Sequence, residues 1–226
     1  MLLSLIFVSL IIVTYIAIEL TQKPSQAIFF KGIASFSFVI VWALASLKVG
    51  ILIEYQILIL LGLVLGLLGD ITLALRPLRP AEENDDLILR GMSLFSFGHF
   101  FYLLAILTMA NFHYLALIVG IVVMLGVIVV SKKFHYQMGK TTIYNYLYAF
   151  FLFFMVGQSL GVGLTTGFST FSVFLLIGFG LFGVSDLFLA SIYYQQKNTK
   201  LMVALNLLTY YGAQINYVKE GNNIVI

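Results

Sequence analysis

The sequence predicts an all-α, polytopic membrane protein with eight transmembrane helices in one bundle. Of its 226 residues, 62% are hydrophobic and only 9% are charged, whereas a globular protein carries about 25% charged residues. The mean hydropathy of +1.07 indicates that lipid is the solvent for most of the surface. The apolar residues also gather in eight runs, each close to the ~20 residues that a membrane helix needs.

The eight apolar runs follow one another along the whole chain. The first has neither the basic start nor the small-residue cleavage site of a signal peptide, so we interpret it as a span. The connections are short, and we find no linker and no repeat of fixed period, so we predict a single domain over residues 1–226. The runs are 2–20, 28–47, 51–75, 87–109, 114–131, 144–165, 171–192 and 201–218.

The placement of lysine and arginine predicts the orientation in the bilayer. Ten of the twelve lie in or beside the connections that follow the first, third, fifth and seventh spans. Because basic residues concentrate on the cytoplasmic side, we expect these connections to be cytoplasmic and both termini to lie on the opposite face. We expect the protein to reside in the plasma membrane.

Several chemistries fit the composition poorly. A net charge of +3 without a large basic cluster argues against nucleic acid as a partner. The absence of cysteine excludes disulfides and thiol catalysis. Of the three histidines, only His99 lies within a span, while His113 and His135 lie in connections, so we expect no metal site. We expect no organic cofactor either.

Two carboxylates lie inside apolar spans at matched depth. Asp70 precedes the end of the third span by five residues, and Asp186 precedes the end of the seventh by about six. At 1.5 Å per residue, both lie roughly 8–9 Å inside the cytoplasmic face. Lys31, at the start of the second span, is shallower on the same face. Ionisable groups at this depth face protein or water, which makes them functional candidates.

Other polar side chains reach the same layer from deeper in the bilayer. His99 lies in the middle of the fourth span, with Tyr102 three residues on. In the eighth span, Asn206, Tyr210 and Gln214 recur every four residues and form a stripe on one helix face. A polar cavity open to the cytoplasm would satisfy the whole set. The alternative is that each residue only fastens neighbouring helices together.

Glycines precede each of the two aspartates at close spacing. Small residues in membrane helices let neighbouring backbones approach one another, so we predict close helix packing beside both acids. The glycines are Gly62, Gly66, Gly69, Gly178, Gly180 and Gly183.

Four segments, taken in order, resemble the YhhN family of lysoplasmalogenase-like membrane proteins. They resemble the family's GD-x-x-L, G-H-x-x-Y, S-D-x-x-L-A and T-Y-Y-x-A-Q elements, and the resemblance covers about residues 23–218. The basic residue near the family's second span matches either Lys23 or Lys31. The 76–87 connection is longer than the family pattern, and the fifth and sixth spans carry no matched element. The segments are 68–73 (LGDITL), 91–102 (GMSLFSFGHFFY), 184–190 (VSDLFLA) and 208–214 (LTYYGAQ).

The resemblance implies hydrolysis of the vinyl ether bond of lysoplasmalogens, so the expected partners are a lysophospholipid substrate and the lipid bilayer. The products would be a fatty aldehyde and a glycerophospho-ethanolamine or -choline. Cleavage needs a proton delivered to carbon and water added to the resulting cation, as in glycoside hydrolysis, where two carboxyl groups share the work. Our hypothesis is that Asp70 and Asp186 are this pair.

The remaining polar residues are candidates for substrate binding. We expect Tyr210 and Gln214 to orient water or glycerol oxygens, with Asn206 on the same stripe. We expect His99 and Tyr102 to bind an acid or the substrate by hydrogen bonds. Lys31, which lies near the cytoplasmic rim, is placed to attract the lipid phosphate.

Two other classes of function compete with hydrolysis. The buried acids also suit a small proton-coupled transporter or a lipid-binding membrane protein, although we find no inverted repeat and no proline-broken helix pair. A purely structural membrane protein is the third class, and the set of polar residues at matched depth argues against it.

Overall fold

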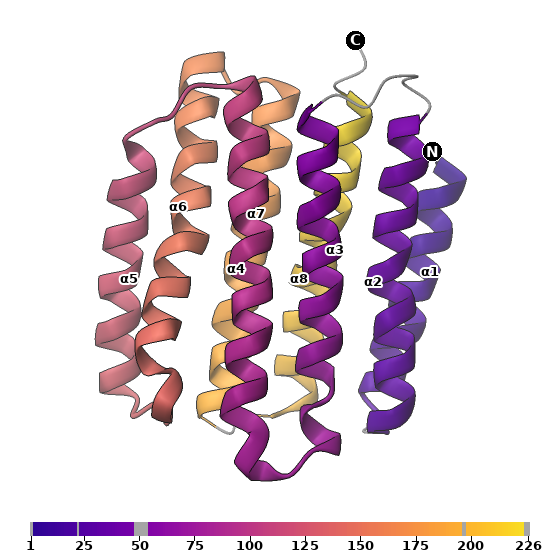
Figure 1. Cartoon of the computed structure of the whole chain (residues 1–226), viewed down its shortest axis with the longest axis vertical. Helices are drawn as coiled ribbons and strands as arrows, with labels where there is room; N and C mark the ends of the chain where they lie inside the picture. Colours follow the sequence, from indigo (N-terminus) through magenta and orange to yellow (C-terminus); the bar gives the residue numbers. More distant parts are fainter. Residues whose placement is uncertain (1, 22, 48–53, 196–197, 224–226) are drawn as a thin grey trace. The chain divides into compact units, whose positions relative to one another are not determined.

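The protein is all-helical, with short connections, in the part of the chain that the structure describes. The computed structural model describes residues 2–21, 23–47, 54–195 and 198–223, and side chains at 2–5, 45, 47 and 217–223 are outside that description. These residues contain eight α-helices, three short 3-10 helices and the connections between them, and no strand occurs among them (Figure 1). The α-helices are α1 (Leu2–Glu19), α2 (Pro24–Leu47), α3 (Glu54–Ala74), α4 (Asn84–Met109), α5 (Leu115–Lys133), α6 (Thr142–Thr166), α7 (Thr170–Tyr194) and α8 (Lys200–Asn223).

Six of these helices are long and apolar enough to cross a membrane, namely α2 to α7. This confirms a multi-pass, all-helical membrane protein. The described apolar part of α1, Ile6–Glu19, is shorter than a span. The helix α8, which carries the polar stripe, is not among the six. The count of eight spans therefore stays a prediction.

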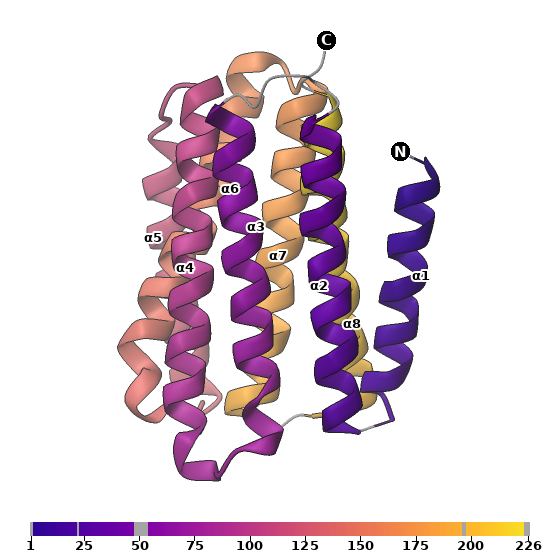
Figure 2. The same ribbon diagram turned by 45° about the vertical axis from the view of Figure 1, so that its right-hand side comes forward.

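The chain divides into two compact units of four long helices each. Unit 1, Met1–Met109, holds α1 to α4, and unit 2, which begins at Ala110, holds α5 to α8. Within unit 1, α1 packs on α2, α2 on α3, and α3 on α4; unit 2 repeats this sequential order from α5 to α8 (Figure 2). The prediction of a single domain stays a prediction.

Glycines let α3 and α4 pack closely in unit 1. A methyl group on Gly69 would lie 2.8 Å from the ring of Phe95, and one on Gly62 would collide with the ring of Tyr102. Gly66 has ordinary room for a methyl group, 3.9 Å from Phe95. Gly62 and Gly69 therefore confirm the predicted close packing before Asp70, and Gly66 is not required for it.

In unit 2, a buried glutamine holds the connection that leads into α5. The Gln158 side chain accepts a hydrogen bond from the His113 backbone N–H at 2.9 Å and donates one to the Asn111 carbonyl at 2.9 Å. Beside it, a methyl group on Gly157 would lie 2.5 Å from the Leu115 carbonyl oxygen. Because that obstacle is backbone, no side-chain rotation can relieve it.

We predict that Gly157→Ala destabilises the protein by about 1–3 kcal/mol, the usual cost of overpacking a helix interface. The midpoint of thermal unfolding in detergent should fall by several degrees. Gly126→Ala on α5 is the matched control, because a methyl group there meets nothing within 4 Å. An equal effect of the two substitutions would contradict this account of the α5–α6 interface.

Candidate functional site

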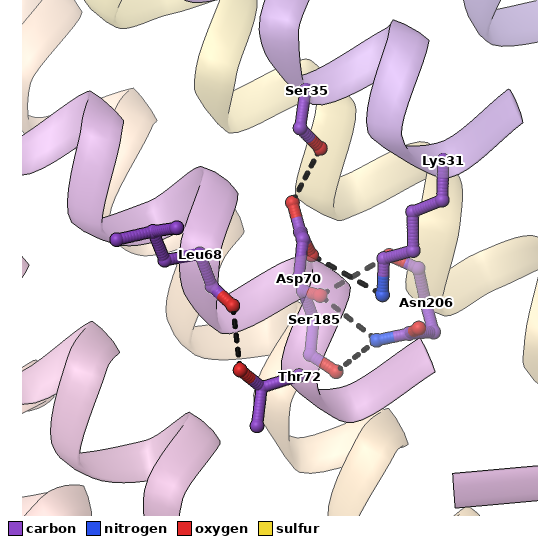
Figure 3. A network of polar contacts seen from close by, with 7 residues as sticks. All are labelled: Lys31, Ser35, Leu68, Asp70, Thr72, Ser185 and Asn206. Carbon is purple, nitrogen blue, oxygen red and sulfur yellow. Dashed lines mark hydrogen bonds and ion pairs between the residues drawn. The ribbon is translucent and has the colours of Figure 1, made fainter. Parts of the chain in front are cut away.

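A buried ion pair joins α2 to α3 in unit 1. Lys31 Nζ lies 3.2 Å from Asp70 Oδ1, and the side chains of the two residues are 15% and 3% exposed. The Ser35 hydroxyl donates a hydrogen bond to Asp70 Oδ2 at 2.5 Å. Lys31 and Ser35 are four residues apart, so both point from one face of α2 toward the carboxylate (Figure 3).

This arrangement explains how a carboxylate is accommodated within a span. Burying an ionised carboxylate costs much free energy unless the charge is paired and hydrogen-bonded, and here each Asp70 oxygen has a partner. Thr72, two residues on, donates its hydroxyl to the Leu68 carbonyl of its own helix at 2.7 Å (Figure 3). Sequence reasoning missed Ser35, although its four-residue spacing from Lys31 was a usable signal.

The α4 histidine is anchored to the backbone of its own helix through one ring nitrogen. His99 is buried, and its Nδ1 lies 2.7 Å from the Phe95 carbonyl oxygen. A carbonyl oxygen only accepts, so Nδ1 carries the hydrogen of this contact, and in a neutral ring Nε2 would then be an acceptor. Tyr102 is also buried and meets the His99 ring edge to face, with the ring centroids 6.0 Å apart.

The second predicted acid lies on α7 in unit 2 and is half-buried. The Tyr148 hydroxyl of α6 donates a hydrogen bond to Asp186 Oδ2 at 2.6 Å. Sequence reasoning missed Tyr148 because the sixth span carries no matched family element. The signal was the polar residue Asn145 three positions before it, on a neighbouring face of an otherwise apolar helix.

The α8 stripe begins with an asparagine that binds α7. Asn206 Nδ2 donates to the Ser185 carbonyl and to its hydroxyl oxygen, each at 2.9 Å, and the Ser185 hydroxyl donates to the Asn206 carbonyl at 3.1 Å. Figure 3 shows the two side chains facing each other. These contacts fasten α7 to α8, so Asn206 has a structural task. A role for Asn206 in substrate binding stays a prediction.

The rest of the stripe is buried as well. Tyr210 packs edge to face on Phe182 of α7, with the ring centroids 5.4 Å apart. Gln214 is 5% exposed, and among the described residues none hydrogen-bonds its Oε1. Buried polar atoms in native proteins nearly all have a partner, so this amide oxygen is a candidate acceptor for a polar ligand.

Each unit thus holds one of the two predicted acids. In unit 1, Lys31 and Ser35 contact the carboxylate of Asp70, and in unit 2 the Tyr148 hydroxyl donates a hydrogen bond to Asp186. That the two carboxylates act together stays a prediction.

The fold and these groups define a multi-pass helical membrane protein with acids held inside its spans. The YhhN family model matches residues 26–219 of the chain. The protein therefore belongs to the YhhN family. No curated protein and no solved structure matches the chain.

We predict that Lys31→Met lowers the free energy of unfolding by about 3–5 kcal/mol, because it leaves a buried carboxylate without its counter-ion. Adding Asp70→Asn should restore much of that loss. Thermal unfolding in detergent measures both changes, and Lys23→Met at an exposed position is the control. If Lys31→Met proves no worse than the control, the ion pair does not stabilise the fold.

Proposed function

We propose that this protein is a membrane hydrolase that cleaves the vinyl ether bond of lysoplasmalogens. The observation that carries the proposal is the Asp70 carboxylate, which is buried in a span and held by both an ammonium and a hydroxyl group. Membership of the YhhN family supports it, because the resemblance to lysoplasmalogenase-like proteins implies this activity. The products are a fatty aldehyde and a glycerophospho-ethanolamine or -choline.

The reaction consumes one water and needs acid and base. A carboxylic acid gives its proton to the vinyl carbon farther from the ether oxygen, and the double-bond electrons form the new C–H bond. The ether oxygen stabilises the resulting cation, and water adds to the carbon beside that oxygen as a base takes the water's proton. The hemiacetal then collapses to the aldehyde and a free glycerol hydroxyl group.

The ion pair suggests how the two aspartates divide this work. The Lys31 ammonium pairs with one Asp70 oxygen and the Ser35 hydroxyl donates to the other, so we assign to Asp70 the ionised role that stabilises the cation or activates water. The acid role then falls to Asp186. In this proposal Lys31 is the counter-ion of Asp70, and its predicted attraction for the lipid phosphate would be a second task.

We assign the other polar residues to binding the substrate and orienting water. Tyr210 and Gln214 orient water or the glycerol oxygens, and the buried Gln214 Oε1 supports this role. His99 and Tyr102 bind the substrate or an acid, and His99 does so through Nε2, because Nδ1 is engaged by the Phe95 carbonyl. Asn206 contributes mainly by fixing α8 on α7.

We also propose the placement in the membrane. α1 and α8 complete eight spans, and the basic connections face the cytoplasm, so both termini lie on the other side of a plasma membrane. Both aspartates then lie in the cytoplasmic half of the bilayer. A lysolipid has a single chain and can enter sideways between helices.

A small proton-coupled transporter or lipid-binding protein is the second candidate. The same ion pair favours it, because paired ionisable groups in spans also form proton relays. Release of aldehyde from lysoplasmenyl-ethanolamine by the purified protein separates the two candidates, since neither a transporter nor a binding protein breaks the bond.

We predict that Asp70→Asn and Asp186→Asn each lower aldehyde release from lysoplasmenyl-ethanolamine by about 100-fold or more, because each removes an acid or base from the reaction. Glu54→Gln on α3 is the matched control, since it changes an exposed acid of the same helix. It should keep wild-type turnover. Wild-type turnover by either Asp variant, with folding verified in detergent, would remove that acid from the mechanism.

A further inference from the structure

The α6–α7 interface of unit 2 directs a tyrosine hydroxyl at the predicted proton donor. Tyr148 donates to Asp186 Oδ2 at 2.6 Å, which is within the range of a well-formed O–H···O hydrogen bond. We infer that Tyr148 is a positioning residue that orients the Asp186 carboxyl group, so that Oδ1 is the oxygen that gives up the proton. This inference rests on the proposed function and adds to it a residue that the sequence did not single out.

The packing around Tyr148 fixes the register of α6 against α7. On one side of it, Asn145 Nδ2 donates to the Tyr194 hydroxyl at 2.9 Å. On the other side, a methyl group on Gly183 would lie 3.0 Å from the ring of Phe153, so the helices approach closely there. With α6 held at both points, the Tyr148 hydroxyl has a defined position relative to Asp186.

The two units hold their acids in the same manner. Each acid lies on the third long helix of its unit and receives a hydroxyl hydrogen bond from the second, Ser35 in unit 1 and Tyr148 in unit 2. The two acid-bearing helices share the pattern Gly-x7-Asp-x2-Leu-Ala, which occurs at 62–74 and at 178–190. In both units, therefore, a hydroxyl group of the preceding helix donates a hydrogen bond to the acid, and in unit 2 that hydroxyl belongs to Tyr148.

The hydrogen bond also determines which oxygen carries the proton. With Oδ2 accepting from Tyr148, the protonated form of Asp186 carries its hydrogen on Oδ1. When Oδ1 gives that proton to the vinyl carbon, the group becomes a carboxylate and the Tyr148 hydrogen bond becomes charge-assisted, which makes it stronger. Tyr148 keeps its own proton throughout. Its hydrogen bond to Asp186 strengthens as negative charge develops on the carboxyl group, and this lowers the activation barrier for protonation of the vinyl carbon.

The test compares Tyr148→Phe with Tyr146→Phe. Both substitutions remove one interhelical hydroxyl from α6, but Tyr146 bonds Ser131 of α5 at 2.9 Å and does not take part in the reaction. We expect Tyr148→Phe to lower kcat for aldehyde release by about 10- to 100-fold, as for the loss of a hydrogen bond to a charged group, with KM nearly unchanged. Tyr146→Phe should keep wild-type kcat.

A second measurement does not depend on turnover. The infrared carboxyl band of Asp186, identified by its loss in Asp186→Asn, should shift in Tyr148→Phe and stay in place in Tyr146→Phe. Equal kcat values for the two Phe variants, or an unmoved band in Tyr148→Phe, would overturn the inference. A wild type that releases no aldehyde would contradict the proposed function, and the infrared band would then still decide whether Tyr148 holds Asp186.

Discussion

The buried carboxylate of Asp70 is the constraint around which unit 1 is arranged. A carboxylate within a span is tolerated only when it faces protein or water and its charge is paired. Here the Lys31 ammonium pairs with one oxygen of Asp70, and the Ser35 hydroxyl donates a hydrogen bond to the other. Both partners come from one face of α2, so the register of α2 on α3 is fixed by the need to satisfy one charge. Such a pair contributes little net stability compared with an apolar core.

Close helix approach makes these contacts possible. Gly69 admits the ring of Phe95 between α3 and α4 beside the first acid, and Gly183 admits that of Phe153 between α6 and α7 beside the second. Without a hydrophobic driving force between helices in lipid, such packing and the polar contacts are the main sources of association. The residues that let the helices pack within each unit are thus close in sequence to Asp70 and Asp186.

The positions of most helices could be predicted from the sequence, because they depend on hydropathy and on the length of the apolar runs. The apolar runs located the helices α2 to α7, although α4 begins three residues before the predicted 87. The pattern of charges within apolar spans identified Asp70, Asp186 and Lys31. It did not identify Ser35 or Tyr148, because single hydroxyl residues are common in membrane helices and only the three-dimensional register shows which of them meets a carboxylate. Likewise, Asn206 belongs to a regular stripe, but only the structure shows that its amide is bound to Ser185.

If Asp70 and Asp186 act on the same bond, as we propose, their side chains must lie close together, and cross-linking measures that distance. Since the chain has no cysteine, Asp70→Cys combined with Asp186→Cys can be treated with a short bismaleimide and digested for mass spectrometry. Ser35→Cys with Asp70→Cys is the positive control, because those side chains are in contact. We expect a cross-linked peptide that joins α3 to α7 within one chain. A control pair that links while the 70–186 pair does not would contradict it.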